Sequence, residues 1–412
     1  MAKIFPFQPY RYSGAAGPIE ALVTQPYDKI TPQMRTRYLA LSPYNLVRVI
    51  LGERSDADSA ENNVYTRAAA HLNDWITRGV LVKEAEPAVF AYFQEFSVPD
   101  TGERLVRKGF SGLGAVEDYS EGVVHRHEQT LSGPKKDRLE LLRHTRAHAG
   151  QLFMLYPDPE GEIDRILDEA AAGEPSAAVT DEYHTLHSLW RIAEPERIAA
   201  ITRAMAAKKL LIADGHHRYE TALAFRNENP GLEDARRVMM TFVNMFSPGL
   251  KILATHRLVG GLADFESQEL IPAAGLRPVR DLAALRALWA EPHKGLVRIG
   301  VALAGIEPLY LYEAERAAGE LDVPVLHQRL LGEALGIGEE AVREEKNTRY
   351  MRGAEPAIAE VRRGAAQAAF LLEPTPIDDM ARIAFAGGVM PQKSTDFYPK
   401  LLSGLTIYKL EC

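Results

Sequence analysis

The fold of this chain is indicated most clearly by the stretch Ile212-Ala213-Asp214-Gly215-His216-His217-Arg218-Tyr219-Glu220. An apolar strand runs into a glycine turn, and the turn opens a helix. This geometry brings backbone N–H groups and the positive end of a helix to one point, where an anion is stabilised. The two histidines and the arginine add hydrogen-bond donors that suit phosphate oxygens. The stretch therefore predicts a phosphate-binding turn.

Asp214 stands at the end of the strand, immediately before this turn. A carboxylate in that position could hold a magnesium ion or accept a proton from an attacking hydroxyl. The structural alternative is an aspartate that caps the helix, beside histidines that only satisfy loop hydrogen bonds. Because Asp, Gly, two His and Arg occur together in one turn, we favour the functional interpretation.

Strands and helices alternate around this turn, and their order predicts an α/β protein. In the first 260 residues we expect strands at 44–51, 88–96, 105–116, 210–213 and 238–245, and helices at 60–78, 135–148, 196–207 and 219–227. Beyond them we expect helices near 282–290, 327–335 and 355–364, and strands near 297–303, 308–312 and 368–372. The glycine pair Gly260-Gly261 suggests a boundary, which gives domains 1–260 and 261–412.

Composition narrows the classes of function. The chain has 412 residues, of which 46% are hydrophobic and 25% charged, and its net charge is −8. That charge disfavours a surface that neutralises many phosphates along a nucleic acid. The single cysteine, Cys412, excludes a disulfide within the chain and a site built from several thiolates. Without a hydrophobic leader or a run of about 18 apolar residues, we expect a cytoplasmic protein with no membrane contacts.

Three further groups of polar residues are candidates for a site. Glu128, in the segment 125–130, could act as a base or a metal ligand, or lie in a hydrated loop. Tyr27-Asp28 lies in a turn, where the aspartate is either functional or structural. Arg143 and Arg146 lie three residues apart on an expected helix, so one face could present both to a phosphate. Ordinary surface ion pairs are the alternative for these two arginines.

The segment Gly387-Gly388-Val389-Met390-Pro391-Gln392-Lys393-Ser394-Thr395 is superficially similar to a P-loop. Gln392 occupies the position of the required second glycine, and Pro391 removes a backbone donor. We therefore exclude a P-loop, although Lys393, Ser394 and Thr395 could still contact phosphate from a loop.

The turn Asp214–Arg218 resembles the signature turn of the ParB/sulfiredoxin-like superfamily, in which a Gly-x-x-Arg turn at a helix start binds nucleotide phosphates. The variant Asp-Gly-His-His-Arg is that of the free-serine kinases, which phosphorylate the hydroxyl of L-serine. This resemblance implies a ParB/sulfiredoxin-like core, with an additional C-terminal α/β part, and a kinase activity.

A second resemblance covers nearly the whole chain. Its motifs, in order, are Gln25-Pro26-Tyr27-Asp28, Tyr44-Asn45, His127-Glu128-x-Thr130, Arg138, Arg143-x-x-Arg146, Ala213–Arg218, Thr255-His256-Arg257 and Met390–Thr395. They resemble a widespread bacterial family known as a domain of unknown function. The family itself implies little about activity, and its link to serine kinases rests on the shared turn.

Together these features predict a small-molecule kinase that converts free L-serine to O-phosphoserine, with Mg²⁺ and with ATP, ADP or pyrophosphate as the donor. Glu128 or Asp214 would accept the hydroxyl proton, and His217 would act beside them and grip the donor phosphate. The expected phosphate ligands are Gly215, His216, Arg218, Arg143, Arg146, Arg257, Lys393, Ser394 and Thr395, and the expected substrate ligands are Tyr27, Asp28, His127 and Thr130.

Two other classes of function remain open from the sequence. A nucleotide-binding regulatory protein related to DNA-partitioning proteins would need DNA contacts, which the net charge disfavours. A metal-dependent phosphohydrolase would use the histidines, and stoichiometric transition metal in the purified protein would favour it. The sequence indicates neither the protein ligands of a metal nor the oligomeric state.

Overall fold

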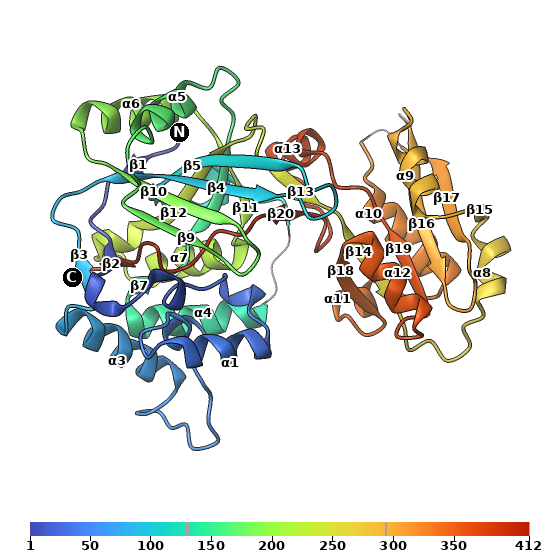
Figure 1. Ribbon diagram of the computed structural model, residues 1–412, viewed down its shortest axis with the longest axis horizontal. Helices are drawn as coiled ribbons and strands as arrows, with labels where there is room; N and C mark the ends of the chain where they lie inside the picture. Colours follow the sequence, from blue (N-terminus) through green and yellow to red (C-terminus); the bar gives the residue numbers. More distant parts are fainter. Residues whose placement is uncertain (129–131, 293–294, 318, 412) are drawn as a thin grey trace. The chain divides into compact units, whose positions relative to one another are not determined.

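The structure is a computed structural model that describes residues 1–128, 132–292, 295–317 and 319–411 (Figure 1). The chain forms two compact units. The first contains residues 1–251 and the segment from 399 onward, and the second contains residues 252–398. The chain thus divides after residue 251 rather than at the predicted boundary of 260, and it returns to the first unit once the second is complete.

Within the described residues, the first unit is built on a nine-stranded mixed sheet with the order β6-β11-β8-β12-β5-β4-β10-β9 and with β1 beside β5. β12 pairs antiparallel with β5 and parallel with β8, which in turn pairs antiparallel with β11. The predicted strands at 88–96, 105–116, 210–213 and 238–245 are confirmed. The strands are β1 (Ile4–Phe5), β4 (Val89–Ser97), β5 (Arg104–Ala115), β6 (Val124–His125), β8 (Leu152–Tyr156), β9 (Ala177–Thr180), β10 (Leu186–Ile192), β11 (Leu210–Asp214) and β12 (Arg237–Asn244).

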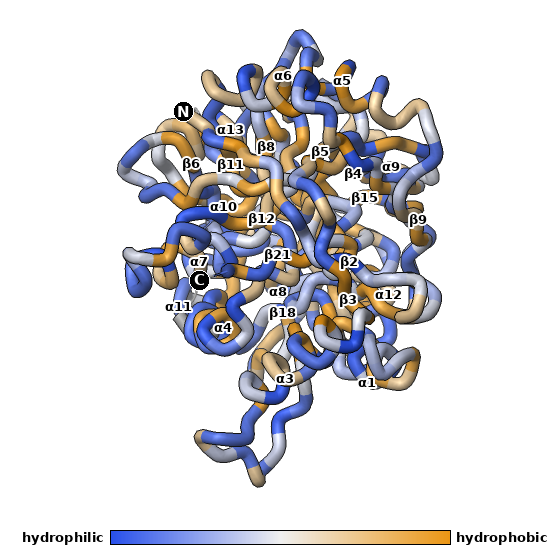
Figure 2. Tube along the Cα trace, turned by 90° about the vertical axis from the view of Figure 1, so that its left-hand side faces the viewer, coloured by the Kyte–Doolittle hydropathy of each residue, from blue (hydrophilic) through white to orange (hydrophobic). Residues whose placement is uncertain are grey.

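Helices cover both sides of this sheet (Figure 1). On one side lie α5 (Glu162–Ala170) and α6 (Pro195–Met205), and on the other lie α7 (His216–Glu228), α4 (Ser132–Thr145), α3 (Val64–Thr77) and α1 (Pro32–Leu41). Leu167 of α5 and Met205 of α6 share one buried cluster with the strand residues Met154 and Phe242. The hydrophobic colour in Figure 2 follows inner strands such as β8 and β12. Because both faces are buried, these strands read as continuous apolar runs.

Residues 399–410, called here the return segment, are almost entirely buried within the first unit. Isolated bridges pair Ser403 with Thr24 and Ile407 with Tyr10. β21 (Tyr408–Lys409) pairs with β7 (Ala147–His148), and a further two-stranded pair joins β2 (Tyr10–Tyr12) to β3 (Leu81–Lys83). The return segment therefore connects three separate parts of the N-terminal half of the chain.

The second unit contains, among the residues described, a six-stranded sheet with the order β15-β17-β16-β19-β14-β18, and its pairs are antiparallel. Its strands are β13 (Lys251–Leu253, which begins at the division), β14 (Thr255–Val259), β15 (Arg277–Val279), β16 (Leu296–Leu303), β17 (Leu309–Glu315), β18 (Thr348–Arg352), β19 (Ala368–Leu371) and β20 (Asp396–Tyr398). Its helices are α8 (Ser267–Ala273), α9 (Leu282–Ala290), α10 (Asp322–Val325), the π-helix η6 (Leu326–Ala334), α11 (Glu339–Arg343), α12 (Ala354–Arg362) and α13 (Ile377–Phe385). The predicted α/β class is confirmed.

The strand predicted at residues 44–51 is wrong. This segment contains α2 (Val47–Ile50), a short helix that follows a turn. In that turn the Asn45 side-chain oxygen accepts a hydrogen bond from the Val47 N–H at 2.9 Å. Val47, Val49 and Ile50 are all buried, and a short apolar run buried on every side has no period that separates a strand from a helix.

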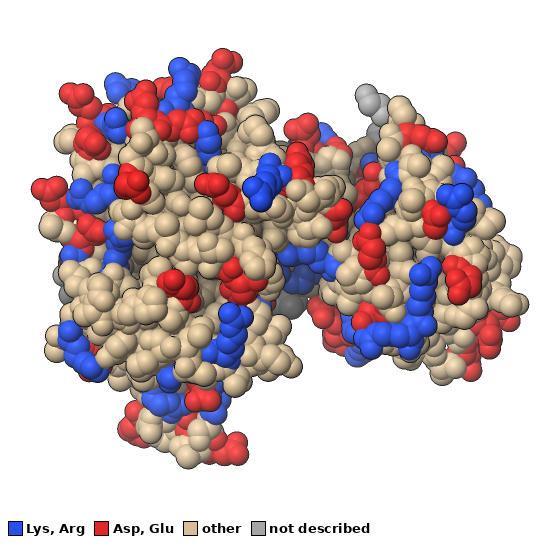
Figure 3. Space-filling model, viewed as in Figure 1, with Lys and Arg blue, Asp and Glu red and all other residues tan. Residues whose placement is uncertain are grey.

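The surface of the molecule mixes both signs of charge. On the face shown in Figure 3, basic and acidic side chains are interspersed. This agrees with a chain that has 56 acidic and 48 basic residues. None of the helices in the described part of the chain is long and apolar enough to cross a lipid bilayer.

Candidate functional site

β11 and α7 meet at a turn whose shape requires glycine. Gly215 has φ +97°, a left-handed conformation that residues with a side chain rarely adopt. A Cβ atom placed there would lie 2.9 Å from Leu152 Cδ2 and 3.1 Å from Arg218 Cζ. α7 starts at His216, so the N–H groups of its first turn, which lack partners inside the helix, lie at the end of β11. The turn therefore has the geometry of an anion-binding helix start.

Asp214 is surrounded by positive charge from three segments of the chain. Arg218 Nη2 lies 3.0 Å from its Oδ2, and Lys400 Nζ lies 3.7 Å from its Oδ1. Burial raises the pKa of Asp214, but Lys400, Arg218 and Lys29 outweigh burial and hold this pKa well below its usual value. Asp214 is therefore ionised at neutral pH. Because a general base works best with a pKa near the working pH, Asp214 is poorly suited to accept a hydroxyl proton.

His216 and His127 form a buried pair beside the turn. The His127 N–H donates to His216 Nε2 at 3.4 Å, and the two rings meet edge to face with their centroids 4.7 Å apart. His127 Nδ1 lies 2.7 Å from the Ile212 carbonyl oxygen. Burial lowers the pKa of His127 to about 4 and that of His216 well below its usual value, so both rings are neutral at pH 7. These two predicted ligands therefore support the turn from inside the fold.

His217, in contrast, is half-buried and lies among carboxylates. Burial lowers its pKa, whereas Glu220, Glu128 and Asp28 each raise it. Glu220 lies on α7, Glu128 precedes α4, and Asp28 lies on the 3-10 helix η3 (Tyr27–Lys29). The structure thus brings Asp28 and Glu128, from two motifs distant in the sequence, into electrostatic range of the His217 imidazole.

Tyr27 lies between two adjoining cavities. Arg138 Cζ stacks 4.2 Å from the centroid of the Tyr27 ring, and both residues line both cavities. The first cavity, of about 70 Å³, extends to Arg218 and Ser403. The second, of about 410 Å³, has apolar and aromatic walls and charged side chains at its edge. Its lining includes Val49, Ile50, Val64, Tyr65, Leu141, Arg54 and Asp137.

Arg143 and Arg146 do not share a helix face. α4 ends at Thr145, and Arg146 lies beyond it with a positive φ of 47°. Arg143 is exposed, and its guanidinium forms ion pairs with Glu140 and with Glu228. This is the alternative that the sequence left open for Arg143. Thr130, predicted as a substrate ligand, lies outside the described residues.

Four predicted phosphate ligands belong to the second unit. Arg257 is 1% exposed, and its Nη2 donates to the Lys393 carbonyl oxygen at 3.2 Å. Ser394 is buried and its hydroxyl donates to the Pro391 carbonyl oxygen at 2.6 Å. Lys393 is exposed and Thr395 is half-buried. The motif containing Arg257 therefore packs against the motif at 390–395, and the arginine donates hydrogen bonds to backbone carbonyl groups there.

The sequence analysis missed Lys400 and Lys29, which complete the positive surroundings of Asp214. Lys29 directly follows Asp28, the last residue of a recognised motif, so it could have been included among the candidate site residues. Lys400 lies in the return segment, 186 positions after Asp214, and the only local signal is a lysine followed by a stretch rich in apolar residues. A sequence pattern of that kind does not say where the lysine points.

Protein ligands for a metal are few in this region. Among the residues that the structure describes, no group of three or more histidine, cysteine, aspartate or glutamate side chains is arranged to hold a metal ion. Mg²⁺ that arrives with a substrate phosphate needs only one or two protein carboxylates. Asp28 and Glu128, beside His217, fit that smaller requirement.

Comparison with solved structures gives neighbours of low identity. A conserved hypothetical protein from Pyrococcus furiosus is 14% identical at a TM-score of 0.37, over 70% of this chain and 92% of its own. A free serine kinase in complex with AMP is 13% identical at a TM-score of 0.36, over 69% of this chain and 89% of its own. SbnI with a C-terminal truncation, from Staphylococcus aureus, is 11% identical at a TM-score of 0.36, over 72% and 87%.

At the level of sequence, none of the curated proteins matches the chain. One family model matches residues 4–321, which is most of the chain, and its description is "Protein of unknown function (DUF1015)". The membership of a family of unknown function that the motifs predicted is thereby confirmed, and this protein belongs to the DUF1015 family.

Proposed function

We propose that the protein is a phosphotransferase that phosphorylates the hydroxyl of a small molecule, with free L-serine as the acceptor. The observation that carries this proposal is the concentration of positive charge around Asp214, at a glycine turn that opens α7. Fixed cations and helix N–H groups stabilise the charge that develops on a transferred phosphoryl group. The acceptor follows from the resemblance of Asp214–Arg218 to the turn of the free-serine kinases, on which a ParB/sulfiredoxin-like core is also proposed.

In this proposal the turn holds the donor. The backbone of Gly215 and the guanidinium of Arg218 bind its terminal phosphate, while Asp214 orients Arg218 through their 3.0 Å contact. His217 faces the reacting groups from the start of α7, within range of Asp28 and Glu128. His216 and His127 fix the turn and do not contact the substrate.

The acceptor hydroxyl oxygen attacks the terminal phosphorus of the donor. The new O–P bond forms as the bond between that phosphorus and the leaving oxygen of the donor breaks, so the donor departs one phosphoryl group shorter. The hydroxyl proton passes to Glu128, because the low pKa of Asp214 removes it from this role. Asp28 faces the ammonium group of serine. Asp28 or Glu128 would hold Mg²⁺, which would supply neutralisation of the phosphate charge.

The two cavities beside Tyr27 support a nucleotide rather than pyrophosphate as the donor. A ligand with its phosphates at Arg218 would pass Tyr27 and Arg138 and place an apolar ring system in the larger cavity. Aromatic and aliphatic walls with a few charged groups are typical of sites for such rings.

Phosphorus NMR of the purified protein with L-serine and Mg²⁺ tests the proposal, with ATP, ADP and pyrophosphate supplied separately. We expect a phosphoserine resonance with a nucleotide donor, and its loss in His217→Ala. His184→Asn is the matched control, because His184 is exposed, lies in the first unit and has a left-handed φ of 61° that asparagine tolerates.

Other outcomes would replace the proposal. Consumption of the donor without phosphoserine would indicate a phosphohydrolase or another acceptor. Unchanged phosphorus signals with every donor would favour a binding or regulatory protein.

A further inference from the structure

The return segment carries one lysine into the surroundings of Asp214. Its other residues from 401 to 408 are buried, and the side chain of Lys400 itself is only 9% exposed. A lysine ammonium is strongly hydrated, so removing it from water is unfavourable unless anions replace the water. The Asp214 Oδ1 atom, 3.7 Å from Lys400 Nζ, is one such anion.

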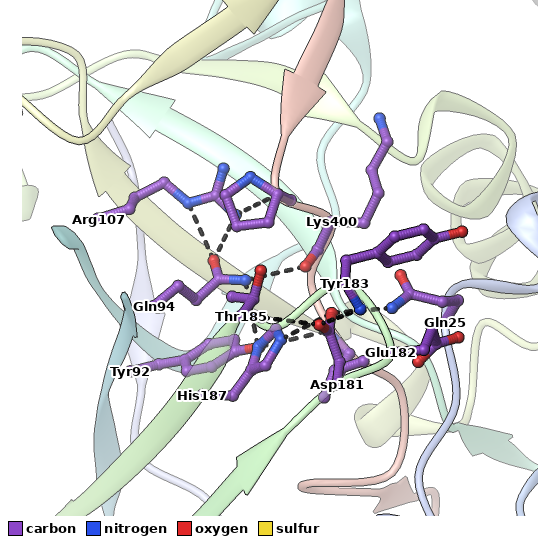
Figure 4. A network of polar contacts seen from close by, with 12 residues as sticks. Gln25, Tyr92, Gln94, Arg107, Asp181, Glu182, Tyr183, Thr185, His187 and Lys400 are labelled. Atoms are coloured by element: carbon purple, nitrogen blue, oxygen red, sulfur yellow. Dashed lines mark hydrogen bonds and ion pairs between the residues drawn. The ribbon is translucent and has the colours of Figure 1, made fainter. Parts of the chain in front are cut away.

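Lys400 is held in place through its own backbone and its neighbours (Figure 4). The Gln94 side-chain amide donates to the Lys400 carbonyl oxygen at 2.9 Å. Arg107, which is fully buried and stacks 4.5 Å from the Phe153 ring, donates to the Pro399 carbonyl oxygen. The Leu402 N–H donates to the Tyr92 hydroxyl at 3.2 Å. Three residues at the start of the return segment, Pro399, Lys400 and Leu402, are therefore bound by side chains of the sheet.

Further side chains hold Tyr92 in place through a chain of hydrogen bonds. Because the Tyr92 hydroxyl accepts from Leu402, it donates its own proton to His187 Nδ1 at 2.7 Å. His187 Nε2 then carries the ring proton and donates to Asp181 Oδ2 at 3.2 Å. The Gln25 amide also donates to Asp181, at 3.0 Å. The chain of contacts from Asp181 to Leu402 is fully directional, so it fixes the path of the return segment.

Lys400 is a second cation at the Asp214 carboxylate. Arg218 already contacts the other carboxylate oxygen at 3.0 Å, and Lys29 lies within electrostatic range. Two cations beside one carboxylate repel each other, and a second anion bound at the same place would relieve this repulsion. α7 begins at His216, two residues after Asp214, and the N–H groups of its first turn have no partners within the helix.

We propose that Lys400 is a phosphate-binding residue of the site, delivered by the return segment, and that Tyr92 is a positioning residue for it. The ligand class is a pyrophosphate group, free or within a nucleoside diphosphate. This inference rests on the proposed function for the role of that group as phosphoryl donor. Its test measures binding, so it can succeed or fail separately from phosphoryl transfer.

Calorimetric titration of the full chain with pyrophosphate and with ADP tests the inference. We expect Lys400→Met to weaken binding of both at least tenfold, because one charge-assisted contact is lost, and Lys400→Arg to restore part of the affinity. Lys409→Met is the matched control, because Lys409 lies on the same segment and its ammonium donates to the Thr145 carbonyl oxygen instead. Thermal unfolding without ligand shows whether each variant is folded.

A double-mutant cycle tests Tyr92. Tyr92→Phe should weaken pyrophosphate binding about threefold to tenfold in the natural chain and have no effect when Lys400 is already methionine. Equal losses in both backgrounds would show a merely structural role. Binding by folded Lys400→Met at the strength of the natural chain would overturn the proposal for Lys400, and so would a natural chain that binds neither ligand. If pyrophosphate binds and its binding depends on Lys400, but no phosphoserine forms, this inference stands and the proposed function is removed.

Discussion

Arg218 and Arg257 each follow a histidine in a recognised motif, yet the two units use them differently. Arg257 is enclosed, donates to the carbonyl groups of Thr255 and Lys393, and stacks 5.3 Å from the Tyr350 ring. Arg218 also donates to one carbonyl group, that of Gln151, but its other Nη atom shares the carboxylate of Asp214 with Lys400, and the side chain lines a cavity. An arginine bound to neutral carbonyl groups inside a fold fixes the chain, whereas one that shares a carboxylate with a second cation keeps positive charge for a ligand.

The largest effect is expected from Arg218→Met. Loss of a preorganised charged donor to a transferred phosphoryl group should lower kcat/KM for phosphoserine formation by about 100-fold or more. Arg218→Lys should restore only a small part, because an ammonium cannot reproduce the guanidinium geometry. Initial rates measured on protein shown to be folded by circular dichroism would check this. Unchanged rates in Arg218→Met would remove the contrast with Arg257.

Arg257→Met should show the reverse pattern. We expect the free energy of unfolding to fall by about 2–4 kcal/mol, because two carbonyl groups lose a charged donor and a buried side chain is replaced. Pyrophosphate affinity should stay within twofold of the natural chain. Urea denaturation and calorimetry measure the two quantities. Normal stability with lost affinity would instead support the sequence-based prediction that Arg257 is a phosphate ligand.

Acid should act through buried histidines in both units, because burial also lowers the pKa of His127, beside the Asp214 turn, to about 4. Burial lowers the pKa of His256 and of His327 in the second unit to about 4, from an unfolded value of 6.5. Between these values the unfolded chain binds more protons, so the free energy of unfolding falls as the pH falls from about 6.5 to 4. The pKa of Asp214 is depressed instead, so its ion pairs persist through that range and weaken only below the unfolded aspartate value of 3.8.

His327→Met should remove part of this acid sensitivity. The loss of stability between pH 7 and pH 5 should shrink by about 1–2 kcal/mol, which is the linkage energy of one buried histidine. Urea denaturation at both pH values measures the change. An identical pH dependence in the variant would show that His327 is protonated as readily in the folded chain as in the unfolded one.

The smallest effect is expected from Arg143→Ala. Its partners Glu140 and Glu228 are partly exposed, and such ion pairs contribute little. The free energy of unfolding should change by no more than about 0.5 kcal/mol, with kcat/KM unchanged. A loss of phosphoserine formation would place Arg143 among the phosphate ligands after all.

The sequence was sufficient wherever the deciding interactions are local. The turn at Gly215 could be predicted because strand, glycine and helix start are contiguous, and the strands β4 and β5 because each is a run rich in apolar residues that ends at the short turn between them. Residues 44–51 failed because burial on every side removes the period on which such a prediction depends.

The burial and the position of a side chain could not be predicted where they depend on contacts between residues far apart in the sequence. His216 and His217 are adjacent in the sequence, but only the packing of His127 decides that one is buried and the other faces carboxylates. Lys400 could not be assigned, because its place depends on a path that leaves the first unit at residue 251 and returns at 399. For the same reason, the boundary predicted at the glycine pair assigned residues 399–412 to the second unit, whereas they belong to the first.

The path of the return segment also sets an order of events during synthesis. The ribosome must make all of residues 252–398 before it can supply Lys400. At about 5–20 residues per second, these roughly 150 residues take about 7–30 s. During that interval the nine-stranded sheet lacks the segment that Gln94, Arg107 and Tyr92 bind, so their polar groups face water or a temporary partner. Newly made chains therefore pass through a period in which the first unit is present without Lys400 at the proposed anion site.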